Sequence, residues 1–385
     1  MPKWVRRVGA IAAAATAGTA AWTTGAQAAT PTINLGSAHA AVTLPSGCHA
    51  NSFTVTGSAD GSYHGYLQAT CNKKGRFYYV SRSPAGKWAL RTTKIDIQIP
   101  LATTTDNTGT YYVGVRSNHD LILVRRNGNG SLSKVHVLAK PAHGEGPSGF
   151  DAASVTASNG NYWATWASWN CGPCEWIEYG VEQARTMVPS IAPRFVGGDQ
   201  WYSPLIVARP GKAAQLVACE MDTDHMPDAV SSAIVATPNG KDWKLSQQFT
   251  SDDCDRFGGT PTNAVASYLG GHTYFAHDGS PGIYDDRSGT FKPTALTGIT
   301  GPKAILGITH TRVAFIGTTK SGEAEWLQNS DGTFNAAPTG SLSAAPVPVR
   351  TDQLINRSGK LIRLFIQEDT TRHIGGARLL EQVQQ

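Results

Sequence analysis

A pattern of short strands and turns recurs along almost the whole chain, and it limits the possible folds more than any other feature. Each copy contains an alternating apolar strand, a polar or glycine turn, a second strand, another turn and a shorter third strand. The clearest copy occupies residues 109–140. Copies begin at Ser62, Gly109, Asn161, Ala213, His272, Thr311 and Gly359.

A short strand of small residues precedes several of these copies and follows a segment rich in glycine or proline. Such strands lie in 146–158, 202–210, 259–269, 301–309 and 345–357. Small residues suit an innermost strand where several sheets converge on an axis, and four strands per unit of roughly 40 to 60 residues are typical of a β-propeller. We therefore predict an all-β fold, a single seven-bladed β-propeller, with six or eight blades as alternative blade numbers. Two side-by-side β-sandwiches are the alternative, although no Pro/Ser linker divides the chain.

Closure of the ring requires strands from both ends of the chain in one blade, because an open ring exposes unpaired sheet edges. The segment 40–44, AAVTL, is the candidate N-terminal strand, and we expect it to join the last blade as its outer strand.

Four turns resemble the Ser-x-Asp-x-Gly-x-x-Trp turn of sialidase-type propellers. They lie at 83–88, 237–243, 286–291 and 330–334. Each is expected between a third and a fourth strand. The resemblance supports a propeller and implies no catalysis, because that motif is a structural turn remote from the active site.

The first 28 residues have the features of a secretory signal peptide. Lys3, Arg6 and Arg7 precede an alanine-rich stretch, and Ala26-Gln27-Ala28 is a small-x-small cleavage site. We predict a signal peptide at 1–28 and a secreted, extracellular propeller domain at 29–385. The apolar run is interrupted and shorter than the ~20 residues that span a bilayer, so we expect no membrane anchor.

The charge of the chain argues against a nucleic-acid partner. Removing residues 1–28 takes away three cations, so the formal charge of +5 falls to +2. The remaining Lys and Arg residues form only short pairs, not the dense basic patch of a nucleic-acid-binding protein.

Six cysteines in an exported chain predict three disulfides. Proximity along the chain favours Cys48–Cys71, Cys171–Cys174 and Cys219–Cys254, although six cysteines allow fifteen connectivities. Cys171-Gly-Pro-Cys174 matches the core of the thioredoxin motif, but strand-like residues flank it on both sides where a redox site needs a helix. We expect a staple across a hairpin tip, with redox function as the alternative.

Acidic residues provide candidates for a metal site or a catalytic site. Oxygen ligands for Ca²⁺ occur at Asp222, Asp224, Asp252 and Asp253, without the spacing of an EF-hand, and ordinary turn residues are the alternative. No cofactor is predicted. A glycosidase would need two carboxylates, for which the candidates are Glu145, Asp151, Asp199 and Asp278, and nothing in their spacing selects a pair.

Four tryptophans are concentrated in one repeat, at Trp163, Trp166, Trp169 and Trp176. Alternate strand positions ordinarily face the core, so we expect them there. Sugar stacking or a protein-binding patch is the alternative.

The export signal, the divergent seven-fold repeat, the Cys-Gly-Pro-Cys segment and the length together resemble secreted streptomycete propeller proteins of the dispase autolysis-inducing type. The resemblance implies a non-enzymatic monomer that binds a thermolysin-like neutral metalloprotease, promotes its autolysis, and serves as a glutamine-donor substrate of a secreted transglutaminase. Donors must lie in accessible backbone, and the candidates, for each of which ordinary polar surface is the alternative, are Gln200, Gln328, Gln382, Gln384 and Gln385. The alternative function is a carbohydrate-active propeller, either a glycoside hydrolase or lectin-like.

Overall fold

The computed structural model describes residues 33–385 with internal gaps. The gaps are 59, 142–147, 159, 171–175, 186–187, 190–199, 210–211, 213, 222–230, 240–241, 251–263, 278–281, 288–291, 309–311, 343–351, 358–359, 369–376 and 384. Throughout these described ranges the secondary structure consists of strands and turns, with no helix. In this part of the chain no helix is therefore long and apolar enough to cross a membrane.

The described strands pair into seven four-stranded antiparallel sheets. The first sheet contains β2 (Cys48–Gly57), β3 (Tyr63–Cys71), β4 (Lys74–Arg82) and β5 (Trp88–Thr92), and the second contains β6 (Ile99–Asp106), β7 (Gly109–Val115), β8 (Leu121–Asn127) and β9 (His136–Ala139). The third contains β10 (Ser148–Ser158), β11 (Asn161–Asn170), β12 (Trp176–Arg185) and β13 (Val188–Pro189), and the fourth contains β14 (Gln200–Val207), β15 (Gln215–Met221), β16 (Ser231–Asn239) and β17 (Asp242–Thr250).

The remaining sheets complete the set. The fifth contains β18 (Ala264–Leu269), β19 (His272–His277), β20 (Gly282–Asp285) and β21 (Lys292–Ala295), and the sixth contains β22 (Ile299–Gly307), β23 (Val313–Thr319), β24 (Gly322–Leu327) and β25 (Gly340–Ser341). The closing sheet contains β26 (Asp352–Arg357), β27 (Lys360–Glu368), β28 (Ala377–Val383) and β1 (His39–Thr43).

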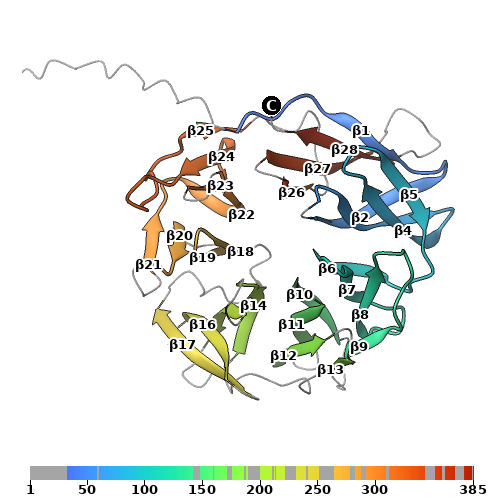
Figure 1. The fold of residues 1–385 in the computed structure, drawn as a ribbon, viewed down its shortest axis with the longest axis horizontal. Helices are drawn as coiled ribbons and strands as arrows, with labels where there is room; N and C mark the ends of the chain where they lie inside the picture. Colours follow the sequence, from blue (N-terminus) through green and yellow to red (C-terminus); the bar gives the residue numbers. More distant parts are fainter. Residues whose placement is uncertain are drawn as a thin grey trace, which may run out of the picture.

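The sheets are arranged in a ring around a common centre, and the first strand of each sheet lies innermost (Figure 1). The prediction of an all-β propeller is confirmed. The second strands β3, β7, β11, β15, β19, β23 and β27 begin within about two residues of the repeat copies expected from the sequence. The small-residue segments form the inner strands, because little space remains for side chains where the sheets converge.

The two ends of the chain meet in the closing sheet, as the sequence predicts. β1 pairs with β28, with His39 opposite Glu381 and Thr43 opposite Arg378. The order β1-β28-β27-β26 places β1 on the outside of this sheet. Leu364 and Ile366 of β27 share a buried core with the first sheet, so the ring is closed by hydrogen bonds and by apolar packing.

The four sialidase-like turns lie where they are expected, between β4 and β5, β16 and β17, β20 and β21, and β24 and β25. At 330–334 the carboxylate Oδ1 of Asp331 accepts hydrogen bonds from the backbone N–H (2.9 Å) and the hydroxyl (2.7 Å) of Thr333. The same geometry recurs at Asp60 with Ser62 and at Asn129 with Ser131. A short polar side chain that binds the backbone two residues ahead fixes a tight turn.

Candidate functional site

A groove opens between the first and second sheets, on the face of the ring that carries the β2–β3, β4–β5, β6–β7 and β8–β9 turns. Its volume is about 950 Å³. Residues that line it on the first sheet include Asp60, Ser62, His64, Tyr79, Lys87, Ala89 and Arg91, and residues on the second sheet include Thr105, Asp106, Arg126, Asn127 and Asn129. The size is at the upper end of the range for small-molecule pockets.

Beneath the groove the two sheets are joined by an aromatic cluster. Tyr66 and Tyr79 lie directly opposite each other on β3 and β4, so their rings share the face that meets the second sheet. Tyr112 of β7 contacts both, with ring centroids 4.5 Å from Tyr66 and 6.5 Å from Tyr79. Burial raises the pKa of Tyr66 and Tyr112 well above the ordinary tyrosine value, and of the three rings that of Tyr79 lines the groove itself.

A series of hydrogen bonds crosses the first-sheet wall of the groove. The Ser62 hydroxyl donates to Asp60 Oδ1 at 2.7 Å, Ser62 Oγ lies 2.7 Å from His64 Nε2, and His64 Nδ1 lies 2.6 Å from the Tyr79 hydroxyl. Because the serine hydrogen is given to Asp60, Nε2–H of His64 donates to Ser62 and Nδ1 accepts from Tyr79. The bonds run in one direction, from Tyr79 to Asp60.

The imidazole in this series is neutral. Burial lowers the pKa of His64 below its ordinary 6.5; the negative charge of Asp60 opposes this, and the positive charge of Arg126 adds to it. A neutral ring has one N–H and one acceptor nitrogen, which matches the two hydrogen bonds it makes.

Two arginines from opposite walls converge on Tyr79. Arg91 of β5 lies directly opposite Tyr79 in the β4–β5 pairing, and Arg126 of β8 places its Cζ 4.1 Å from the centroid of the Tyr79 ring. Burial raises the pKa of Tyr79, and the charges of Arg126 and Arg91 partly oppose that effect. The groove therefore brings two guanidinium groups and a phenol close together.

The two carboxylates in the groove accept hydrogen bonds from residues of nearby turns. Hydrogen bonds from Ser62 hold the pKa of Asp60 below its ordinary value. Asp106 accepts hydrogen bonds from the backbone N–H groups of Thr108, Gly109 and Gly160, the last of which belongs to the third sheet. A general acid of a glycosidase needs a raised pKa. The lowered pKa of Asp60 does not match that requirement.

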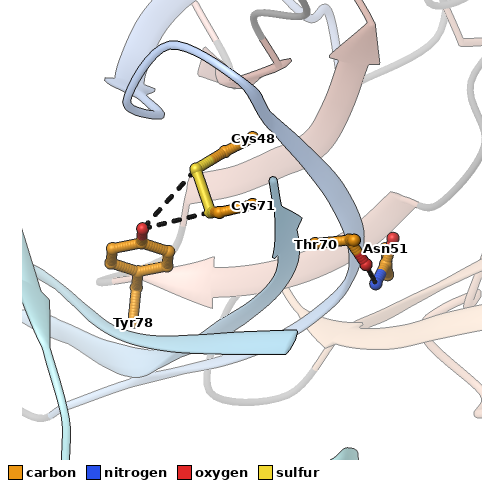
Figure 2. Close-up of a disulfide and its surroundings, with 5 residues drawn as sticks. All are labelled: Cys48, Asn51, Thr70, Cys71 and Tyr78. Atoms are coloured by element: carbon orange, nitrogen blue, oxygen red, sulfur yellow. Dashed lines mark hydrogen bonds between the residues drawn. A yellow bond between two sulfur atoms is a disulfide. The ribbon is translucent and has the colours of Figure 1, made fainter. Parts of the chain in front are cut away.

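The disulfide predicted between Cys48 and Cys71 is present (Figure 2). The two residues lie opposite each other where β2 begins and β3 ends. The Tyr78 hydroxyl lies 3.7 Å from Cys48 Sγ and 3.4 Å from Cys71 Sγ, and Asn51 Nδ2 donates to Thr70 Oγ1 at 3.0 Å nearby.

The other cysteines lie outside the described residues, except that the backbone of Cys219 belongs to β15. The segments flanking Cys171-Gly-Pro-Cys174 are described, and both are strands: β11 ends at Asn170, which pairs with Trp176 at the start of β12. The expectation of strands on both sides of the motif is confirmed, whereas a thioredoxin-type site would continue into a helix. Whether the two sulfurs are joined stays a prediction.

The candidate donor glutamines differ in how far they are buried. Gln328 has an exposed fraction of 0%, and its Nε2 donates to the Gly332 carbonyl at 2.8 Å. Gln382 has an exposed fraction of 4% and donates to the Gly36 carbonyl. The expectation that these two side chains are accessible donors is wrong, because both are held in the interior. Gln385 is exposed, Gln200 is described only as backbone in β14, and Gln384 lies outside the described residues.

The candidate metal ligands Asp222, Asp224, Asp252 and Asp253 lie outside the described residues. So do Glu145, Asp199 and Asp278, and Asp151 is described only as backbone in β10. Within the described ranges, no group of three or more His, Cys, Asp or Glu residues is arranged to hold a metal ion.

The expected core position of the tryptophans is confirmed for Trp166 and met only in part by Trp163. Trp166 has an exposed fraction of 3% and belongs to the core between the second and third sheets, and Trp163 is half-buried. The side chains of Trp169 and Trp176 lie outside the described part of the chain.

The groove was not predicted from the sequence. The segment Asp60-Gly-Ser62-Tyr-His64 carried a local signal, since a turn-forming Asp precedes two polar residues at alternate positions, which places Ser62 and His64 on one face of a strand. The position of Arg126 against Tyr79 depends on how two sheets face each other, for which the sequence has no local signal.

No family model and no curated protein matches the chain. Its structure is similar to that of a lectin from Burkholderia pseudomallei (11% identity, covering 83% of this chain and 92% of the lectin, TM-score 0.53). It is also similar to an α-L-arabinanase from Penicillium chrysogenum (8%, 74% and 94%, 0.47) and to an α-L-arabinofuranosidase from Fusarium graminearum (10%, 87% and 93%, 0.44). At 11% identity the likeness to the lectin shows only the propeller fold.

Proposed function

We propose that this chain is a secreted, lectin-like propeller that binds a saccharide in the groove between the first and second sheets. The observation that carries the proposal is the set of fixed polar groups over an aromatic base: the hydrogen-bond series from Tyr79 to Asp60 on one wall, and Arg126 and two asparagines on the other. We also propose that the seven four-stranded sheets are the seven blades of one propeller, which the sheet pairing and the ring in Figure 1 support.

The chemistry of the walls suits sugar hydroxyl groups. A hydroxyl is both donor and acceptor, and the groove offers a carboxylate at Asp60, amides at Asn127 and Asn129, and guanidinium groups at Arg91 and Arg126. Polar groups that are already held in place lose little conformational freedom when a ligand binds. The lowered pKa of Asp60 favours binding over hydrolysis at this site.

Secretion is part of the proposal. The basic and apolar pattern of residues 1–28 supports it, and so does the disulfide between Cys48 and Cys71, since disulfides form and persist in oxidising compartments.

A steric block of the groove tests the proposed function. Ala89 lines the groove, so Ala89→Trp fills it, whereas Ala337→Trp adds the same side chain at an exposed position between β24 and β25 of the sixth sheet. We expect the parent protein and Ala337→Trp to bind saccharides on a glycan array. We expect Ala89→Trp to lose this binding. Failure of the parent protein to bind any saccharide would end the proposal, and unchanged binding by Ala89→Trp would move the site elsewhere.

The second candidate is the binding protein that promotes autolysis of a neutral metalloprotease and is modified by a transglutaminase. One observation favours the transglutaminase part: Gln385 is exposed beside the last strand, where its N–H donates to the Asn34 carbonyl and its Oε1 accepts from the Asn34 side chain. Incubation with a microbial transglutaminase and a fluorescent amine, followed by peptide mapping, should label Gln385 and leave Gln328 and Gln382 unlabelled. A metalloprotease whose lifetime is unchanged by the protein would contradict the autolysis part.

A further inference from the structure

We infer that the saccharide held in this groove is anionic and that Arg91 and Arg126 bind its carboxylate or sulfate group. This inference rests on the proposed function and specifies its ligand. Its basis is the balance of charge in the groove and the position of the two arginines.

Cationic side chains outnumber carboxylates among the lining residues. Arg82, Lys87, Arg91 and Arg126 line the groove together with two carboxylates, Asp60 and Asp106. Arg82 already forms an ion pair with Glu381 of the closing sheet, where its Nε lies 3.1 Å from Glu381 Oε1. Lys87, Arg91 and Arg126 remain as the positive charges of the site, and none of them forms an ion pair with another described residue.

The two carboxylates offset part of this charge, and three cations against two carboxylates leave a net positive charge. Asp60 Oδ1 accepts two hydrogen bonds from Ser62, and Asp106 accepts from three backbone N–H groups. His64 adds no charge at neutral pH, because burial keeps its pKa low. The net potential of the groove is therefore positive, which attracts an anion and disfavours a cation.

The position of Arg126 prepares it to bind an oxyanion. Its guanidinium group lies against the Tyr79 ring, with Cζ 4.1 Å from the centroid, and it also forms a hydrogen bond with the Tyr79 side chain, so the group is held in place within the groove. Arg91 approaches the same tyrosine from β5. A planar guanidinium matches a carboxylate or sulfate with two parallel hydrogen bonds, and the second arginine supplies charge from the opposite wall.

Neighbouring groups suit the rest of a sugar ring. Asn127 and Asn129 follow Arg126 along the groove, and Asp60 lies on the opposite wall as an exposed acceptor. The volume of about 950 Å³ accommodates more than a single small anion. An isolated inorganic ion would leave most of these polar groups unused, which favours an acidic oligosaccharide.

Three kinds of immobilised glycan test the inference: oligomers of galacturonate, glucuronate and mannuronate; the methyl esters of the same oligomers; and sulfated galactans with their unsulfated counterparts. The parent protein should bind acidic members and lose binding to each neutral counterpart. Arg91→Gln/Arg126→Gln should weaken binding about tenfold or more, since charge-assisted hydrogen bonds are lost. Arg76→Gln is the control, because Arg76 lies on β4 of the first sheet and does not line the groove.

The outcomes distinguish failure of the anionic ligand from failure of the proposed saccharide binding. Equal binding to an acid and its ester, or an unchanged affinity for the double variant, overturns the anionic ligand and leaves saccharide binding intact. Binding to no glycan, neutral or acidic, overturns the proposed function itself. Preference for uronates over sulfated galactans, or the reverse, identifies which oxyanion the arginines select. Circular dichroism of the double variant confirms that its fold is retained.

Discussion

Trp88 Nε1 donates a hydrogen bond of 3.0 Å to Glu381 Oε2 and so joins β5 of the first sheet to β28 of the closing sheet. Oε1 of the same carboxylate lies 3.1 Å from Arg82 Nε. Both members of the ion pair are largely buried, with side-chain exposed fractions of 13% and 9%. One carboxylate therefore links the first sheet of the ring to the last.

Replacing Glu381 should strongly destabilise the fold. Glu381→Leu leaves the Arg82 charge buried without its partner, and removing one member of a buried ion pair costs about 3 to 5 kcal/mol. Glu381→Gln retains an oxygen that can accept from Trp88 and should lose less. Urea denaturation followed by tryptophan fluorescence measures both, and a midpoint for Glu381→Leu equal to that of the parent would contradict this role in closing the ring.

The disulfide of the first sheet should contribute measurable stability. Cys48 and Cys71 are 23 residues apart, and closing a loop of that size in the unfolded chain is worth roughly 3 kcal/mol. The Cys48→Ala/Cys71→Ala variant is expected to unfold at a lower urea concentration, because its unfolded ensemble gains freedom. An identical free energy of unfolding would show that the bond does not constrain the unfolded chain.

His64 should make stability depend on pH below neutrality. Its folded pKa lies below 6.5, so the unfolded chain binds a proton more readily than the folded protein does. The contribution is fully present above pH 6.5 and is lost as the pH falls through the folded pKa. An NMR titration of the His64 ring should give a pKa below 6.5.

A protonated His64 would also present N–H groups to both Ser62 and Tyr79, which disturbs the direction of the hydrogen-bond series. His64→Gln should therefore show a weaker loss of stability between pH 6.5 and 5 than the parent protein. His119→Gln, on an exposed turn, is the control and should keep the parent profile. A His64 pKa at or above 6.5 would refute this account of the series.

Gln328 should matter for stability and not for modification. Its amide donates to the Gly332 carbonyl at 2.8 Å inside the protein, so Gln328→Ala leaves a buried acceptor without that donor, at a cost of about 1 to 3 kcal/mol. Gln385→Ala, at an exposed position, should have little effect. Thermal denaturation of the two variants checks the difference, and equal melting temperatures would contradict it.

The sequence predicted those features that depend on local periodicity. The starts of the repeats, the outer position of β1 and the bond between Cys48 and Cys71 all follow from alternation, turn residues or proximity along the chain. Each depends on residues that are close in sequence or on the need to close a ring.

Features that depend on the contact between sheets could not be predicted. Tyr79 and Arg126 belong to different sheets, and their contact depends on the angle and register at which those sheets meet. The exposure of Gln328 was predicted wrongly for a related reason. Gln328 lies beside a turn, where residues are usually exposed, but the Asp331–Thr333 turn folds back and the Gly332 carbonyl accepts a hydrogen bond from its amide. Proximity to a turn did not reveal the direction of the side chain.

The most direct measurement for the central claim is a crystal structure of the protein with the acidic oligosaccharide that binds most tightly on the array. The account predicts electron density for the sugar between β4 and β8, with its oxyanion within hydrogen-bonding distance of Arg91 and Arg126. Density at the centre of the ring or on another sheet, with an empty groove between the first and second sheets, would contradict it.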